Sequence, residues 1–269
     1  MILRLPLEGK LSAKLTDEVY TIIYRGITRM LTEEEIRQNL IEVEQNIVKA
    51  AQKAGRDRSE IKLISVSKNN TADVLESAYN CGVRVFGENR VQELVGKMDY
   101  FEEKGIKDIE WHLIGHLQTN KVKYIIGRVA MIHSVDSEKL AKAIDDESAK
   151  KGVITDILVE LNIGDEDSKF GLGFDNTLEF IKKIAGFKNI RVKGLMCVAP
   201  YTDDPEENRK YFSKMKQLSV DIQDKNIDNI TMCELSMGMT GDYMVAIEEG
   251  ATCVRVGTGI FGKRDYTIK

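Results

Sequence analysis

The feature that most constrains the fold of this chain is a regular alternation of short apolar runs with longer amphipathic segments, which begins near residue 61. Short runs rich in β-branched residues and bounded by turn residues indicate strands, whereas apolar residues at helical spacing indicate helices. Because helix-like segments separate the strand-like runs, the strands should lie parallel in one sheet. The runs that indicate strands are 61–67, 83–86, 110–114, 129–133, 157–161, 192–196, 232–235 and 253–256.

Repeated strand–helix units can build either an open doubly wound sheet or a closed barrel, and alternation does not distinguish the two. Eight strands in 269 residues favour closure, because (β/α)8 barrels typically have about 250 residues. The sequence therefore predicts a single α/β domain over residues 32–269, with the fold of a (β/α)8 TIM barrel. The helix-like segments are 32–54, 72–80, 90–104, 137–151, 176–185 and 206–224.

Residues 1–31 precede this pattern and are expected to form an N-terminal appendage, with a strand-like run at 19–24. Thr32 is followed three residues later by Glu35, which is the signature of a capping box at a helix start. Met30 lies directly before this start. Translation from Met30 is therefore a second interpretation of the N-terminal region.

The composition favours small-molecule chemistry in a reducing compartment. The formal net charge is −4, 7% of the residues are aromatic and no basic stripe occurs, which argues against a nucleic-acid surface. Cys81, Cys197, Cys233 and Cys253 are scattered without C-x-x-C spacing, as expected of reduced thiols. No uncharged stretch approaches the roughly 18 residues of a membrane helix, and no signal peptide is recognised. We expect a cytoplasmic protein that binds neither nucleic acid nor membrane.

Lys68 closes the first strand-like run and is followed by the turn-forming pair Asn69-Asn70. An amine at an apolar barrel mouth has a lowered pKa and keeps a lone pair that can attack an aldehyde, so Lys68 is a candidate Schiff-base lysine. That chemistry would suit pyridoxal phosphate. The alternative is a solvated loop charge, which is the commoner role of a lysine after a strand.

Polar residues and glycines gather where the predicted strands end, which is where a (β/α)8 barrel carries its reacting groups. Examples are the segments 87–90 after strand two, His116 after strand three and His133 at the end of strand four. Phosphate sites in such barrels often combine the loops after strands seven and eight. Backbone amides and hydroxyls in those loops could bind an anion, although a simple turn explains a Gly-Thr-Gly sequence equally well. The residues concerned are Ser236, Gly238, Gly257 and Thr258.

Arg255 alternates with Val254 and Val256 in the last strand-like run. If the valines face the helices, the period of two residues directs Arg255 into the barrel. A buried guanidinium needs partners, so either an internal salt bridge, for example with Glu234, or a cofactor contact should explain it. The residues alone leave both explanations open.

Together these strings resemble the pyridoxal phosphate homeostasis protein family, whose fold is similar to the N-terminal barrel domain of alanine racemase and to pyridoxal phosphate enzymes of fold type III. The resemblance covers about residues 31–266. It is carried by Val66-Ser67-Lys68 and by the segments 86–93, 112–121, 133–136, 194–196, 235–239 and 254–258. Thr240, where serine is common, is a modest departure from the family pattern.

The resemblance implies that Lys68 holds pyridoxal phosphate as an internal aldimine, a Schiff base. An arginine beside the pyridine nitrogen would keep that nitrogen unprotonated and weaken the ring as an electron sink. The residues implied to bind the cofactor are Lys68; Asn89 and Met196 at the ring; Ser236, Gly257 and Thr258 at the phosphate; and Arg255 at the pyridine nitrogen.

The residues also allow three other site chemistries. His112 and His116 could suggest a metal pair, but the strand-to-loop setting breaks their helical facing and no third ligand presents itself. Glu88 and Glu234 could form a glycosidase pair, yet Trp111 is the only tryptophan available as a sugar platform. A Schiff-base aldolase is the stronger rival, because it uses a lysine and the same phosphate loops.

A racemase needs a second titratable group on the opposite face of the cofactor, which alanine racemase takes from a further domain. No such domain is recognised here. The sequence therefore favours a carrier or regulator in vitamin B6 homeostasis without robust catalysis, and a pyridoxal phosphate-dependent racemase or related enzyme is the alternative. We expect a monomer whose partners are pyridoxal phosphate and apo-enzymes that require it.

Overall fold

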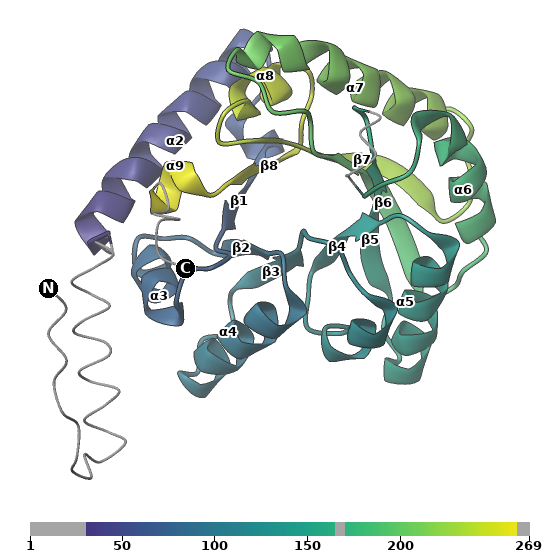
Figure 1. Cartoon of the computed structure of the whole chain (residues 1–269), viewed down its shortest axis with the longest axis horizontal. Coiled ribbons are helices and arrows are strands. Elements are labelled where there is room, and N and C mark those ends of the chain that lie inside the picture. Colours follow the sequence, from purple (N-terminus) through teal and green to yellow (C-terminus); the bar gives the residue numbers. More distant parts are fainter. Residues whose placement is uncertain (1–30, 165–169, 263–269) are drawn as a thin grey trace, which may run out of the picture.

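The strands form one closed parallel barrel in chain order (Figure 1). The computed structural model describes residues 31–164 and 170–262. Pairing of the first strand with both the second and the last closes the sheet, which confirms the predicted (β/α)8 architecture. The strands are β1 Lys62–Val66, β2 Val85–Glu88, β3 Glu110–Leu113, β4 Met131–Val135, β5 Thr155–Leu161, β6 Ile190–Cys197, β7 Ile230–Met239 and β8 Cys253–Val256.

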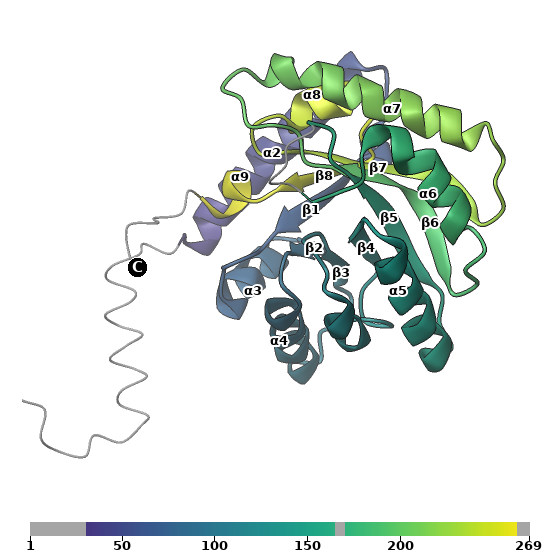
Figure 2. The ribbon, with the colours of Figure 1, turned by 45° about the vertical axis from the view of Figure 1, so that its right-hand side comes forward.

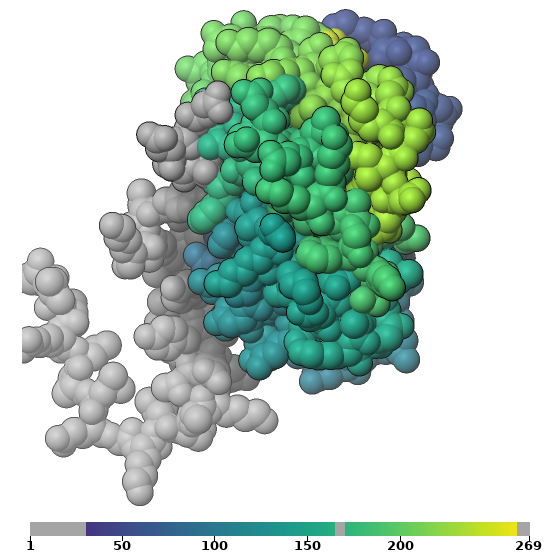
Figure 3. Space-filling model, turned by 90° about the vertical axis from the view of Figure 1, so that its right-hand side faces the viewer, coloured from purple at the N-terminus to yellow at the C-terminus, as the bar shows by residue number. Residues whose placement is uncertain are grey.

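Helices cover the outside of the barrel, as the turned view in Figure 2 shows. Between β3 and β4 the connection contains a short 3-10 helix, Thr119–Tyr124. On the face shown in Figure 3, residues from about 138 to 223, coloured teal to green, make up most of the coloured surface. The helices are α2 Glu33–Lys53, α3 Ala72–Asn80, α4 Val91–Glu103, α5 Glu138–Lys151, α6 Thr177–Ile184, α7 Arg209–Gln223, α8 Tyr243–Glu248 and α9 Thr258–Phe261.

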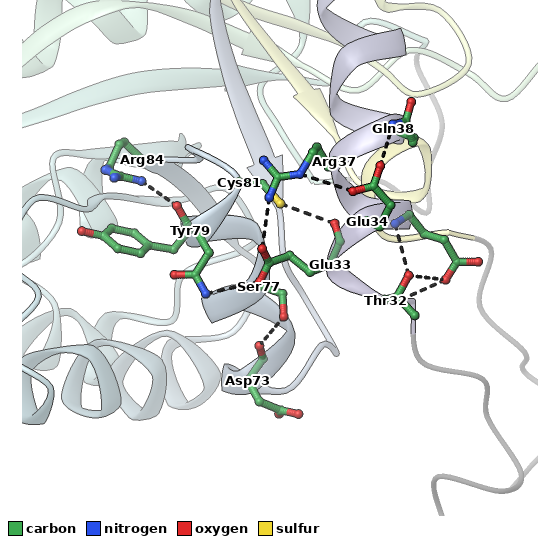
Figure 4. A network of polar contacts seen from close by, with 12 residues as sticks. Thr32, Glu33, Glu34, Arg37, Gln38, Asp73, Ser77, Tyr79, Cys81 and Arg84 are labelled. Carbon is green, nitrogen blue, oxygen red and sulfur yellow. Dashed lines mark hydrogen bonds and ion pairs between the residues drawn. The ribbon is translucent and has the colours of Figure 1, made fainter.

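The long helix α2 begins as predicted. The Thr32 hydroxyl accepts a hydrogen bond from the Glu35 amide, and the Glu35 carboxylate accepts one from the Thr32 amide, which completes a capping box. Figure 4 shows this turn of α2 beside the C-terminal end of α3, where the Cys81 thiol meets the carbonyl of Glu33. The first helix of the pattern is thereby anchored against α3.

The same helix ties the two ends of the described chain together, because α2 packs against α8 and α9. The Asn39 amide donates to the carbonyl of Ile260 at 2.9 Å, and the Arg56 guanidinium donates to the carbonyls of Ile247 at 3.0 Å and Ala251 at 2.8 Å. Helix α2 thus covers the junction between β8 and β1.

Three predicted strands end two or more residues too early. Strand β2 continues past Phe86 to Glu88, β4 past His133 to Val135, and β7 past Leu235 to Met239. Gly87 and Glu88, His133, and Ser236 therefore lie within strands. Ser236 pairs in register with both Met196 of β6 and Cys253 of β8. Polar side chains directed into the barrel interrupt the apolar runs from which strand length was inferred, and so the runs ended too early.

The predicted appendage 1–31, including the strand-like run 19–24, lies outside the described residues except for Leu31. The division into an appendage and a barrel domain at residue 32 therefore stays a prediction. In the described ranges, no helix combines the length and the apolar character that crossing a membrane requires.

Candidate functional site

A cavity of about 540 Å³ opens at the C-terminal ends of the strands. Its size lies within the range of about 300–1,000 Å³ common for small-molecule sites. Five residues predicted from the sequence line it: Lys68, Asn89, Arg255, Gly257 and Thr258. Its remaining wall consists of Val66, Ile114, Val198, Met239, Thr240 and Gly241. The structure therefore brings most of the predicted residues to one place.

The other two predicted residues lie deeper in the barrel. Met196 is 1% exposed and packs with Met131 and Leu158 in the lumen. Ser236 is completely buried, and its hydroxyl contacts His133 and Arg255. Direct contact of Met196 or Ser236 with a cofactor stays a prediction.

Thr240 is a cavity residue that the sequence-based site did not include. Its hydroxyl oxygen accepts hydrogen bonds from the amides of Gly257 and Gly259, both at 3.3 Å. Thr240 thus joins the loop after β7 to the loop after β8, on the wall that holds Thr258. The signal for Thr240 was its place in the segment after strand seven, next to Gly241.

The backbone on both sides of Lys68 is held by contacts with β2 and with helix α4. The amide of Ser67 donates to the carbonyl of Gly87 at 3.0 Å, and the carbonyl of Ser67 accepts from the Lys97 ammonium at 2.9 Å. Asn69 has a left-handed conformation with φ of 60°, which asparagine tolerates better than most residues, and its amide donates to the Glu93 carboxylate at 2.8 Å. These contacts fix the direction in which Lys68 leaves β1.

A buried ion pair supports this turn. The Lys97 ammonium lies 2.5 Å from Glu88 Oε1, and the two side chains are 7% and 0% exposed. The Ser67 hydroxyl donates to the same carboxylate oxygen at 2.5 Å. Burial raises the pKa of Glu88, whereas the Lys97 charge and these hydrogen bonds act in the opposite direction. Glu88 therefore supports the Lys68 turn from behind the sheet.

A column of hydrogen-bonded side chains fills the lumen below the cavity. The Lys62 ammonium donates to Glu110 Oε1 at 2.5 Å, and the same oxygen lies 2.8 Å from His112 Nε2. His112 Nδ1 lies 2.8 Å from His133 Nε2. We call this set, together with Ser236 and Arg255, the lumen column.

The upper end of the lumen column reaches the cavity. His133 Nδ1 lies 2.9 Å from the Ser236 hydroxyl, which accepts a hydrogen bond from Arg255 Nη1 at 2.5 Å. Arg255 Nη2 donates to the carbonyl of Cys197 at 2.7 Å. The predicted inward orientation of Arg255 is confirmed, because Arg255 lines the cavity while Val254 and Val256 pack in the core. Its observed partners are Ser236 and Cys197, in place of the suggested salt bridge to Glu234.

Burial and hydrogen bonding set the charges in this column. The hydrogen bond from His112 is the main cause that lowers the pKa of Glu110, to about 2, so this carboxyl is ionised at neutral pH. Burial lowers the pKa of His112 and lowers that of His133 well below its ordinary value. Both imidazoles are therefore neutral at pH 7.

Glu160 of β5 lies near the Arg255 end of the lumen column. Burial and the negative charge of Asp136 raise its pKa to about 7, against the opposing effect of Arg255. One of its carboxyl oxygens, Oε2, is buried without a hydrogen-bond partner among the described residues. Glu160 is therefore expected to titrate near neutral pH.

The other candidate pairs do not form sites of the expected kind. His112 lies in the lumen, whereas His116 stacks on Phe170 with 3.9 Å between ring centroids. No cluster of three metal-binding side chains occurs in the ranges that the structure describes. Glu234 accepts hydrogen bonds from the Thr252 hydroxyl and the Cys253 thiol, away from the ion pair of Glu88.

Comparisons with known proteins bear on this arrangement. Residues 38–265 match the family model described as alanine racemase, N-terminal domain. The chain is 43% identical over 229 residues to the pyridoxal phosphate homeostasis protein of Aquifex aeolicus, covering 85% of this chain and 98% of that protein. The chain belongs to the pyridoxal phosphate homeostasis protein family.

Solved structures that are similar to this chain support the fold. PipY of Synechococcus elongatus PCC7942, solved with PLP bound, has a TM-score of 0.73 and 30% identity, covering 84% of this chain and all of that chain. An alanine racemase of Clostridium difficile 630 has a TM-score of 0.66 at 15% identity, covering 86% of this chain and 57% of that one. The racemase likeness shows the shared barrel fold alone.

Lys97→Met should destabilise this member of the homeostasis family, because it leaves the Glu88 carboxylate buried without its cation. The expected loss is about 3–5 kcal/mol of the free energy of unfolding, measured by urea denaturation. The control Lys104→Met removes an exposed ion pair with Glu76 and should leave the unfolding midpoint close to that of the wild type. The double variant Lys97→Met/Glu88→Leu should recover most of the loss. Equal losses in the single and double variants would contradict this account.

Glu160→Gln should change how stability depends on pH. In the wild type the folded carboxyl keeps its proton up to a pKa of about 7, whereas the unfolded one releases it near its ordinary value. The unfolded state then binds fewer protons, so this group makes stability fall as pH rises toward 7, by up to about 3 kcal/mol. Urea denaturation between pH 5 and 8 should show that the free energy of unfolding of Glu160→Gln rises relative to that of the wild type as the pH increases. Glu103→Gln, at an exposed position of α4, is the control, and a constant difference across pH would refute the assignment.

Proposed function

We propose that this protein binds pyridoxal phosphate in the cavity at the barrel mouth, with Lys68 as the residue that bonds to it, and that it acts as a carrier or regulator in vitamin B6 homeostasis. The observation that carries the proposal is the convergence of Lys68, Arg255, Gly257 and Thr258 on one cavity. Membership of the homeostasis family and the PLP bound to PipY support the same ligand.

The residues present fit this ligand. Thr258, the first residue of α9, offers a backbone amide and a hydroxyl to a phosphate, and the neighbouring Gly257 amide donates to Thr240 on the same wall. Arg255 offers N–H donors, which suit a pyridine nitrogen that accepts. Asn89 and the apolar side chains Val66, Ile114 and Val198 line the space between, where an aromatic ring could lie.

Bound pyridoxal phosphate supplies an aldehyde that bonds to amines and a ring that withdraws electrons. The protein's contribution is mainly to hold and orient it. A guanidinium cannot give up its proton, so Arg255 does not protonate the pyridine nitrogen and the electron-withdrawing power of the ring stays low. Among the described residues that line the cavity, the titratable side chains are Lys68 and Arg255, and racemisation requires a further acid or base on the opposite face. This supports a carrier over an efficient catalyst.

We further propose a monomer in a reducing cytoplasm. The four cysteines are free thiols, and Cys197 and Cys253 are buried. The cavity is built from strands and loops of a single barrel, so a second copy is not required to complete it.

Lys68→Arg should abolish covalent attachment, because it keeps a cation but removes the nucleophilic amine. Wild-type protein incubated with pyridoxal phosphate should gain visible absorbance, and borohydride should fix the ligand on the peptide that contains Lys68. The control Lys121→Arg should behave as wild type. Attachment to another lysine, or a colourless wild type as expected of an aldolase, would refute the assignment.

The carrier role predicts that the protein can transfer pyridoxal phosphate to an enzyme that requires it. Loaded wild-type protein mixed with an apo-enzyme that requires pyridoxal phosphate should restore the activity of that enzyme, while alanine stays unracemised over the same period. Protein loaded and then fixed with borohydride is the control and should restore nothing. Rapid racemisation of alanine by homogeneous protein would favour the enzyme alternative.

A further inference from the structure

The path from Glu110 to Arg255 within the lumen column has fixed hydrogen-bonding characters at its two ends. Glu110 is an ionised carboxylate at neutral pH, so it can only accept. Arg255 is a guanidinium, so it can only donate. Between these ends lie His112, His133 and the Ser236 hydroxyl, each within 2.9 Å of the next. The direction of every bond in the column can therefore be worked out.

The acceptor end sets both histidine tautomers. His112 must carry its proton on Nε2 to donate to Glu110, which leaves His112 Nδ1 as an acceptor. That acceptor requires the proton of His133 on Nε2, which leaves His133 Nδ1 as an acceptor in turn. The partner of His133 Nδ1 is the Ser236 hydroxyl, which has one proton and must donate it there. Ser236 then accepts from Arg255 through a lone pair.

We infer that Ser236 is a positioning residue for Arg255, held in this role by the lumen column, and that its hydroxyl does not donate to a phosphate. The single hydroxyl proton is already used toward His133, at 2.9 Å. Together with the carbonyl of Cys197, the Ser236 oxygen fixes two nitrogens of the guanidinium. The inference rests on the proposed function for the identity of the ligand that Arg255 meets.

The column orients Arg255 and does not conduct protons to it. Passing a proton from Arg255 to Ser236 would require a neutral guanidine, which proteins do not form at ordinary pH. The effect of Glu110 is therefore to impose one arrangement of donors and acceptors over the whole path. In that arrangement the guanidinium is held at the cavity wall that Gly257 and Thr258 share.

The tautomers can be tested without any ligand. Long-range proton–nitrogen correlation spectra of ¹⁵N-labelled protein at pH 7.5 should contain the ring signals of three histidines. The variant His116→Asn removes the signals of His116, so that those of His112 and His133 can be assigned. His112 and His133 should both be neutral with the proton on Nε2. Ser236→Ala should shift the Nδ1 resonance of His133, which loses its donor. Ser219→Ala, which removes another buried serine hydroxyl on α7, should leave it unchanged. A proton on Nδ1 of either lumen histidine would overturn the inference.

Ligand-binding measurements can distinguish whether Ser236 positions Arg255 or contacts the phosphate. Pyridoxal lacks the phosphate but keeps the ring and the aldehyde, so dissociation constants for pyridoxal phosphate and pyridoxal can be compared. Loss of the hydrogen bond between the Arg255 guanidinium and the Ser236 hydroxyl should weaken ligand binding by at least about tenfold. Ser236→Ala should weaken both ligands by the same factor, Ser236→Thr should recover most of the affinity, and Thr258→Val should weaken pyridoxal phosphate selectively. In an Arg255→Gln background, Ser236→Ala should have no further effect.

The outcomes are distinguishable. A loss in Ser236→Ala confined to pyridoxal phosphate would show a phosphate contact and overturn the inference, while leaving the proposed function intact. Failure of wild-type protein to bind either ligand would refute the proposed function, and the histidine tautomers would then decide the role of Ser236. Ser236→Ala that weakens both ligands equally even without Arg255 would also overturn the inference.

Discussion

Ionisable groups inside a barrel are stable only when each donor and each charge has a partner, and this requirement organises the interior of this protein. The lumen column contains an ammonium, a carboxylate, two imidazoles, a hydroxyl and a guanidinium. Leaving one of them unpaired would cost free energy comparable to a lost hydrogen bond or more. The pairing therefore fixes where Arg255 can lie, and Arg255 forms part of the cavity wall.

A second set of contacts organises the part of the cavity wall that carries Lys68, at the end of the neighbouring strand β1. Lys97 and Glu93 of α4 hold the backbone on either side of Lys68, and Glu88 at the end of β2 balances the Lys97 charge. Lys68 is thus held from behind the sheet and Arg255 from below the cavity. A site built on paired strands and buried ion pairs keeps its shape before a ligand arrives, which lowers the entropy cost of binding.

Much of this organisation could be predicted from the sequence, for identifiable reasons. The alternation of strands and helices predicted the closed barrel, and the family resemblance together with positions at strand ends predicted Lys68, Asn89, Arg255, Gly257 and Thr258 as neighbours. The roles of His133 and Ser236 were not predicted, because polar residues within a strand look like the end of that strand. The pair of Glu88 and Lys97 was missed because it depends on how α4 packs against β2, and local patterns do not encode that distance.

Helix α2 covers the junction between the first and last strands and contacts α8 and α9 through Asn39 and Arg56. The wall that holds Gly257 and Thr258 therefore exists only when the beginning and the end of the described chain have met. A polypeptide still emerging from the ribosome lacks this wall, so the vitamer can be captured only after synthesis has passed residue 258. Loading of the cofactor is in this way postponed until both ends of the described barrel have been made.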